Sequence, residues 1–183
     1  MAPVLSNYEG INSIAFIGNY LPRLCGIATF TSDLVGAVSA EAPGVNSWAV
    51  AINDRSEGYA YPEEVRFEIN ENKLSDYHTA AEFLSINRMD IVCVQHEYGI
   101  FGGPAGSHIL KLLGELRMPV VTTLHTVLKN PSPDQREVMR KLSELSDKMI
   151  VMSRKAVDFL EEIYGIPDDK IAFIHHGIPD TPF

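Results

Sequence analysis

The feature that most constrains the fold is an alternation of short apolar runs with segments of helical periodicity. Most of these runs are continuously apolar, as in the segment IVCV at residues 91–94, and do not alternate between apolar and polar positions. Continuously apolar strands are buried on both faces, which is typical of parallel sheets. The runs predict strands over residues 13–18, 47–52, 64–69, 90–95, 119–124, 148–152 and 170–174.

Helices are predicted between most of these strands. Gly26 is expected to open the first helix, a second starts near Ser75, and Pro104 suits the first turn of a third. Ser132 and Ser153 are expected N-caps of two more, and Ser132 belongs to a capping box. This order predicts an α/β fold, a Rossmann-like, doubly wound, mostly parallel sheet of about seven strands with helices on both faces.

Length, net charge and cysteine content restrict the class of protein and the partners that it can have. The 183 residues suit one domain, 1–183, and the net charge of −9 argues against nucleic acid or anionic lipid as a partner. Neither Cys25 nor Cys93 belongs to a C-x-x-C pair, so neither a zinc ribbon nor a thioredoxin site is present. The N-terminus lacks a signal pattern and no apolar run is long enough for a transmembrane segment, so a cytoplasmic location is expected.

The loop after the first strand is a candidate phosphate site. Ligands of open parallel sheets bind beyond the carboxyl ends of the strands, where Arg23, Cys25 and Gly26 are expected to lie. A glycine at a helix start lets backbone amides approach a phosphate or sugar oxygen, and Arg23 adds positive charge. A helix start without a ligand is the alternative. Neither the dinucleotide-binding glycine fingerprint nor a P-loop is present, which argues against a nicotinamide-dependent oxidoreductase.

The loop after the fourth strand gathers polar residues and glycines. His96 and Glu97 are candidates for acid–base work or hydroxyl binding, followed by Tyr98. Gly102 and Gly103 would let backbone amides point into the cleft. A loop histidine satisfied by protein groups, beside an N-terminal carboxylate, is the alternative. The concentration of unusual residues favours a functional loop.

Histidines follow two further strands. His125 ends the fifth strand, and although a lone strand-end histidine is more often structural, the convergence of three polar loops favours a functional role. His175 and His176 follow the seventh strand. Adjacent strand residues point to opposite faces, so this pair predicts no metal site.

Five segments together resemble the N-terminal half of a retaining GT-B glycosyltransferase of glycosyltransferase family 4. They are PRLCGIATFT at 22–31, QHEYGIFGG at 95–103, TLHT at 123–126, VMS at 151–153 and HHGIPD at 175–180. The resemblance spans nearly the whole chain. One departure is Cys25-Gly26, where the family frequently has a Gly-Gly pair.

The resemblance implies two facing Rossmann-like domains with the active site between them. It implies that Arg23, Cys25 and Gly26 lie by the phosphates and sugar of a nucleotide-diphosphate sugar donor, and that catalytic His125 lies near the transferred sugar. The loop with His96, Glu97, Tyr98, Gly102 and Gly103 would shape the acceptor side, where a carbohydrate or lipid-linked acceptor binds. The implied activity is a retaining hexosyl transfer without a bound metal or other cofactor.

The implied second domain is the main departure. The nucleotide pocket, the basic residues for the diphosphate and the paired glutamates of the family belong to a C-terminal donor domain that is not found in this sequence. A lone acidic half-site stabilises a leaving diphosphate poorly, so this chain by itself is expected to be inactive. The alternative is a non-catalytic Rossmann-like module that binds a sugar or a phosphorylated ligand.

Overall fold

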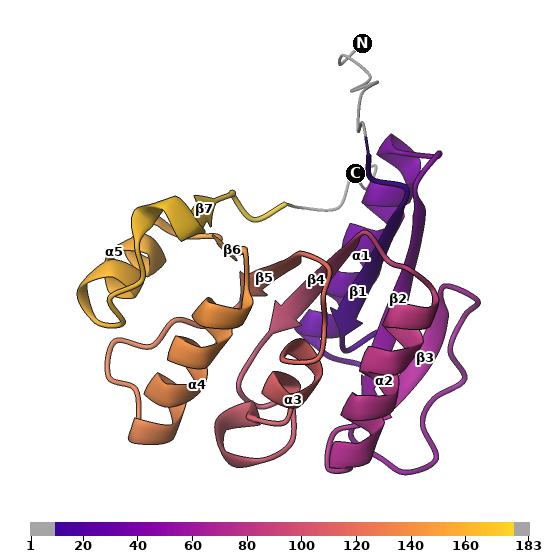
Figure 1. Ribbon diagram of the computed structural model, residues 1–183, viewed down its shortest axis with the longest axis horizontal. Helices are drawn as coiled ribbons and strands as arrows, with labels where there is room; N and C mark the ends of the chain where they lie inside the picture. The colour runs from indigo at the N-terminus through magenta and orange to yellow at the C-terminus, as the bar shows by residue number, and fades with distance from the viewer. Residues whose placement is uncertain (1–9, 178–183) are drawn as a thin grey trace.

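The computed structural model describes residues 10–177. Within them the chain forms one seven-stranded sheet (Figure 1). All seven predicted strands are confirmed, and no strand end is shifted by more than one residue. They are β1 (Ser13–Gly18), β2 (Asn46–Asn53), β3 (Val65–Asn70), β4 (Ile91–His96), β5 (Val120–Leu124), β6 (Lys148–Val151) and β7 (Ile171–Phe173).

The strand order across the sheet is β3-β2-β1-β4-β5-β6-β7, and every neighbouring pair is parallel. The chain therefore builds outward in one direction from β1 to β3 and then restarts beside β1 with β4. Between β1 and β4 the connections diverge, so a crevice is expected at the carboxyl edge there. This is the Rossmann-like, doubly wound sheet that the sequence predicts.

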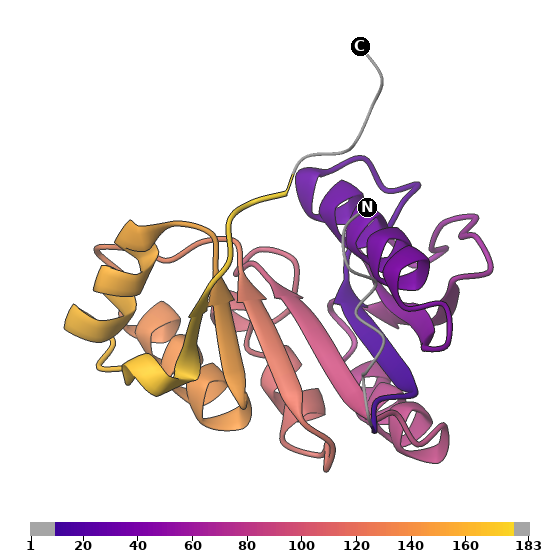
Figure 2. The ribbon, with the colours of Figure 1, turned by 90° about the horizontal axis from the view of Figure 1, so that it is seen from above.

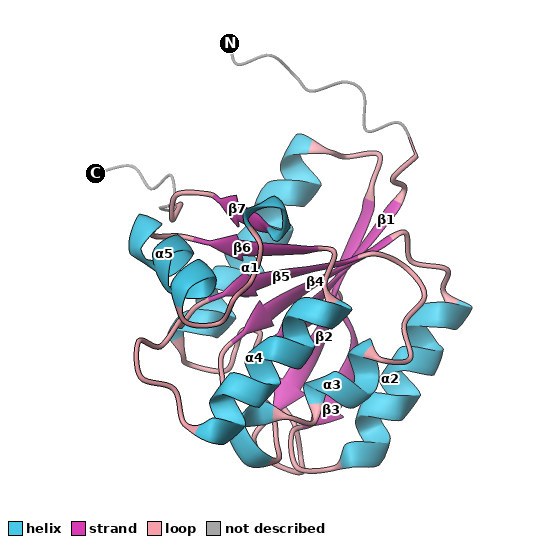
Figure 3. Ribbon diagram, turned by 60° about the vertical axis from the view of Figure 1, so that its left-hand side comes forward, coloured by secondary structure: helices cyan, strands magenta, loops and turns pink. Residues whose placement is uncertain are grey.

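The helices cover both faces, as predicted (Figures 2 and 3). α1 packs against β1 and β2 on one face, where Phe16, Val35 and Ala51 form a small core. The larger core lies on the opposite face and includes Trp48 and Met149. The helices are α1 (Gly26–Glu41), α2 (Leu74–Ile86), α3 (Ile109–Leu113), α4 (Pro133–Leu145) and α5 (Arg154–Glu162).

Three helix starts behave as the sequence predicts. Gly26 is the first residue of α1, and Cys25 is its N-cap. Ser132 accepts a hydrogen bond from the Gln135 amide, and the Gln135 side chain accepts one from the Ser132 amide, which completes the capping box of α4. Ser153 accepts a hydrogen bond from the Ala156 amide at the start of α5. Side-chain acceptors satisfy backbone amides that the helix itself leaves free.

The third helix is shorter than the sequence indicates. Pro104 lies in a short 3-10 turn, η1 (Pro104–Gly106), and α3 begins only at Ile109. Ala105 has a φ of 50°, a left-handed conformation that interrupts a right-handed helix. The link between β2 and β3 has no helix. A second 3-10 turn, η2 (Asp168–Lys170), precedes β7.

Some sequence expectations lie outside the described residues. They concern the polar segment before Gly10 and the end of the family-like closing motif, residues 178–180. Within residues 10–177, no helix combines the length and apolar character that crossing a membrane requires.

Candidate active site

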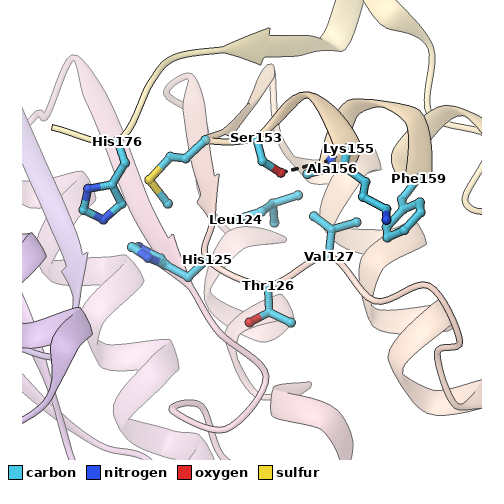
Figure 4. A pocket seen from close by; sticks show the side chains of 10 residues that line it. Leu124, His125, Thr126, Val127, Ser153, Lys155, Ala156, Phe159 and His176 are labelled. Atoms are coloured by element: carbon cyan, nitrogen blue, oxygen red, sulfur yellow. Dashed lines mark hydrogen bonds between the residues drawn. The ribbon is translucent and has the colours of Figure 1, made fainter.

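A cavity of about 470 Å³ opens at the carboxyl edge of β5 and β6 (Figure 4). His176, in the segment after β7, forms part of its wall. This segment runs back across the sheet edge towards α1 (Figure 2). The lining residues are Leu124, His125, Thr126, Val127, Met152, Ser153, Lys155, Ala156, Phe159 and His176. The cavity therefore lies at the carboxyl edge, where open α/β sheets bind ligands, but beside β5 and β6 and not between β1 and β4.

His125 lines this cavity directly after β5. Its backbone amide donates to the carbonyl of His96 at 3.0 Å, which extends the β4–β5 ladder by one bond. Its ring Nε2 lies 3.1 Å from Oε1 of Gln95. The ring centroid of Phe30, from α1, lies 4.8 Å away in an edge-on arrangement. His125 is thus held by residues of α1, β4 and β5.

The imidazole of His125 is neutral at physiological pH. Burial of the ring lowers its pKa to about 4, and the neighbouring His176 adds to the effect. Transfer of a charged ring into a partly buried site costs solvation energy, so the neutral form is favoured. A neutral imidazole offers one N–H donor and one acceptor nitrogen to a ligand.

The start of α1 places two of the predicted phosphate-binding residues at the sheet edge. The Cys25 thiol caps the helix, because its Sγ accepts a hydrogen bond from the Ala28 amide at 3.4 Å. The same sulfur also accepts one from Nδ2 of Asn19 at 3.3 Å. Gly26 is exposed, and a Cβ built there would have no atom within 4 Å. Among residues 10–177, no contact requires glycine at position 26. The prediction that a ligand approaches its backbone stays open.

The sequence predicts that Arg23 adds positive charge for a phosphate, but in the structure carboxylates surround this side chain. Its guanidinium donates to the carbonyl of Ile52 at 3.2 Å and lies within 4.0 Å of the carboxylates of Asp54 and Glu71. A phosphate would have to compete with two carboxylates for this group. Arg23 borders a second cavity, of about 550 Å³, beside the loop after β2. Its role in donor binding stays a prediction.

Two of the predicted acceptor-binding residues lie inside the protein. The side chain of His96 is 0% exposed and packs between the rings of Tyr98 and Phe101, at centroid distances of 5.1 and 5.9 Å. Tyr98 is buried as well. Burial lowers the pKa of His96 to about 3, with a smaller effect from His125. In this conformation neither ring is open to a ligand.

The other residues of the same loop divide between the surface and the interior. Glu97 is half-buried, and its carboxylate accepts hydrogen bonds from the Tyr98 amide and the Thr126 hydroxyl, which links it to the cavity wall. Gly103 is exposed. Gly102 is buried, and its amide donates to the hydroxyl of Tyr77 at 3.3 Å. The expectation that the Gly102 amide points into the cleft is therefore wrong, because a protein group already accepts its hydrogen.

Three side chains at the site have no role predicted from the sequence, namely Lys155 and Phe159 on α5 and Phe30 on α1. His176, for which the sequence predicts no metal-binding role, lines the cavity, and its ring centroid lies 5.3 Å from that of Phe30. Their place in the sequence could have indicated a site role, because a helix that follows a parallel strand begins at the carboxyl edge of the sheet. Within residues 10–177, no group of three or more histidine, cysteine and acidic side chains could hold a metal ion.

The sequence itself decides the family. A family model described as Glycosyltransferase Family 4 matches residues 47–181, well over half of the chain. The chain belongs to glycosyltransferase family 4. The matched segment contains the loop from Glu97 to Gly103 and His125, whereas Gly26 lies before it.

Solved glycosyltransferase structures share the fold. A glycosyltransferase from Rickettsia africae ESF-5 superposes with a TM-score of 0.61 at 19% identity, over 92% of this chain and 44% of that one. The lipopolysaccharide outer core galactosyltransferase WaaB, in its apo form, gives a TM-score of 0.64 at 13% identity, over 91% of this chain and 46% of that one. At these identities the likeness is one of fold, that of an N-terminal GT-B domain.

This family-4 chain spans less than half the length of either solved structure. Among curated proteins, no sequence match was found.

Proposed function

We propose that this chain is the acceptor-side domain of a glycosyltransferase. The enzyme transfers a sugar, of hexosyl type, from a nucleotide-diphosphate sugar to an acceptor hydroxyl with retention of anomeric configuration. His125 is the catalytic residue of this half. The site works without a bound metal or other cofactor, because protein groups stabilise the leaving phosphate. The enzyme acts in the cytoplasm.

The position of the His125 ring in the cavity wall is the observation that carries this proposal. The ring lies at the carboxyl edge of the sheet in a family-4 chain, beside Phe30 from the first turns of α1. A neutral imidazole accepts or donates a hydrogen bond to a sugar hydroxyl without placing a positive charge beside it. Such a contact contributes to catalysis where it strengthens in the transition state.

Donor binding is proposed to need a second domain. Among the described residues 10–177, the two cavity walls carry only Arg23, Arg55 and Lys155 as cationic side chains, and Arg23 is paired with carboxylates. A leaving diphosphate needs several positive or N–H groups for its developing charge. More than half of each of the two longer solved structures lies outside the matched part, which is compatible with a further domain. Accordingly, the 183-residue chain by itself is expected to be inactive.

The test is His125→Ala in the complete enzyme, assayed with a panel of nucleotide sugars. Loss of a group that contacts the reacting sugar is expected to lower kcat by about a hundredfold. The matched control is His78→Ala, because His78 is exposed on α2, away from the cavity, with the exposed Glu82 and the half-buried Glu115 beside it. The thermal unfolding midpoint of both variants should stay close to that of the unchanged enzyme.

Undiminished turnover in the His125→Ala enzyme would contradict the role given to His125. Two other results together would favour the non-catalytic module. The 183-residue chain would bind a sugar or sugar phosphate tightly in calorimetry, and the complete protein would transfer no sugar from any donor in the panel.

A further inference from the structure

Gln95 is the hydrogen-bonding side chain that holds the ring of His125. It is 0% exposed at the end of β4, and its Oε1 lies 3.1 Å from Nε2 of His125. The sheet register pairs Gln95 with Thr123, two residues before His125, and the His125 amide bonds to the carbonyl of His96. The backbone ladder between β4 and β5 therefore holds both side chains in place.

The absence of a side chain at Gly18 leaves room for the side chain of Gln95. A Cβ built on Gly18, at the end of β1, would be 3.0 Å from the Cβ of Gln95 and 3.2 Å from Oγ1 of Thr31. Contacts of 3.0 Å between carbon atoms are too short for a stable packing arrangement. The missing side chain at position 18 thus provides the space that Gln95 needs beside His125.

The two ring nitrogens of His125 have different surroundings. Nε2 faces Gln95, whereas Nδ1 makes no hydrogen bond with any residue in the described range 10–177. The ring itself lines the cavity (Figure 4). Burial lowers the pKa of His125 to about 4, so near pH 7 the ring carries a single N–H. An amide oxygen only accepts hydrogen bonds, so a neutral ring facing it carries its proton on Nε2.

We propose that Gln95 is a positioning residue that holds His125 in the Nε2–H tautomer and leaves Nδ1 as the acceptor that faces a substrate hydroxyl. The identity of the hydroxyl rests on the proposed function, whereas the tautomer does not. A carboxamide turned the other way would donate to Nε2 and give the Nδ1–H tautomer instead. The two arrangements are distinguishable because a neutral imidazole carries its proton on one nitrogen only.

The amide nitrogen of Gln95 has no hydrogen-bond partner among residues 10–177. The bond to His125 is therefore the only hydrogen bond that this carboxamide makes within that range. Substitution of Gln95 releases the imidazole without breaking a larger network. The effect of a variant on the ring can then be interpreted directly.

The experiment is two-bond ¹H–¹⁵N correlation spectroscopy of the 183-residue chain with ¹⁵N-labelled histidine, at a pH near neutrality. The unchanged chain is expected to give the Nε2–H pattern for His125. In Gln95→Leu, which keeps the bulk and removes the acceptor, the two tautomers are expected to become comparably populated. The matched control is Cys93→Ala on the same strand, two residues earlier, and it should keep the pattern of the unchanged chain.

Gln95→Glu provides a second readout with little change in shape. A carboxylate in place of the amide favours the charged imidazole, so the pKa of His125 should rise by about one unit or more in an NMR titration. An Nδ1–H pattern in the unchanged chain would overturn the proposal even if Gln95→Leu failed to fold. An unchanged tautomer in a folded Gln95→Leu chain would also overturn it.

Kinetics of the complete enzyme separate this proposal from the proposed function. Gln95→Leu should lower kcat by about tenfold or more with little change in KM, because a wrong tautomer impairs the chemical step. If His125→Ala leaves turnover intact while the tautomer is as expected, the proposed function fails and the positioning by Gln95 stands. If His125→Ala abolishes turnover and the tautomer is Nδ1–H, the proposed function stands and the positioning role of Gln95 fails.

Discussion

At the scale of single residues, Gly102 shows that a glycine in a candidate site loop can be required by the protein itself. A Cβ built on Gly102 would lie 1.8 Å from the backbone oxygen of Glu71. The same oxygen accepts a hydrogen bond from the Tyr77 hydroxyl at 3.1 Å, and that hydroxyl accepts one from the Gly102 amide. The loop after β4 is thereby joined to the turn that follows β3.

Gly102→Ala is expected to destabilise the domain by more than about 2 kcal/mol, because the added methyl group forces the loop away from Glu71 and breaks the bond to Tyr77. The free energy of unfolding from urea titration measures this. Gly99→Ala is the matched control in the same loop, since a Cβ there meets nothing within 4 Å. It should change stability by less than about 0.5 kcal/mol. Equal effects of the two substitutions would show that the contact with Glu71 is not what requires glycine.

At the scale of elements, the best-predicted features are those that short stretches of sequence determine. The capping box of α4 is local, since Ser132 and Gln135 lie three positions apart and satisfy one another's backbone amides. The late start of the helix predicted after Pro104, which begins only at Ile109, is not local. Gly106 packs under the carbonyl of Tyr98, where a Cβ would lie 2.7 Å away, and the neighbouring Ala105 adopts a φ of 50°.

Ser132→Ala is expected to lower the free energy of unfolding by about 1 kcal/mol, because one backbone amide of α4 loses its acceptor. Ser132→Asp restores an acceptor and should stay close to the unchanged chain. Urea titrations of the three proteins provide the comparison. A loss as large for Asp as for Ala would mean that the hydroxyl of Ser132 does something other than cap the helix.

At the scale of the whole molecule, the strand order brings together residues that are far apart along the chain. β1 and β4 are neighbours, and β4 is central enough for His96 to be fully buried. Both ring nitrogens of His96 lack a partner within residues 10–177. A buried ring of this kind stays neutral and links protonation to unfolding.

The linkage predicts an acid-sensitive fold. The pKa of His96 is about 3 in the folded chain and near 6.5 when unfolded, so below pH 6.5 the unfolded state binds the additional proton. Stability therefore falls as pH drops from 6.5 towards 3, by about 1.4 kcal/mol per pH unit from this residue. His125, with a folded pKa of about 4, acts in the same direction.

His96→Phe should make this dependence shallower by about one proton, because phenylalanine fits between Tyr98 and Phe101 and does not titrate. Free energies of unfolding between about pH 5 and pH 7 measure the slope. An identical slope in the variant and the unchanged chain would contradict the assignment of a neutral, buried His96.

By itself the sequence determined the seven strands, the starts of α1, α4 and α5, the family and the place of His125 at a strand end. These follow from apolar periodicity and capping residues, which act over a few positions. Only the tertiary structure decided that His96 is buried, that Arg23 pairs with Asp54 and Glu71, and that Gln95 meets His125. Each of these depends on strands and loops brought side by side from distant parts of the chain. Local sequence patterns do not predict which partner a polar side chain contacts in the folded protein.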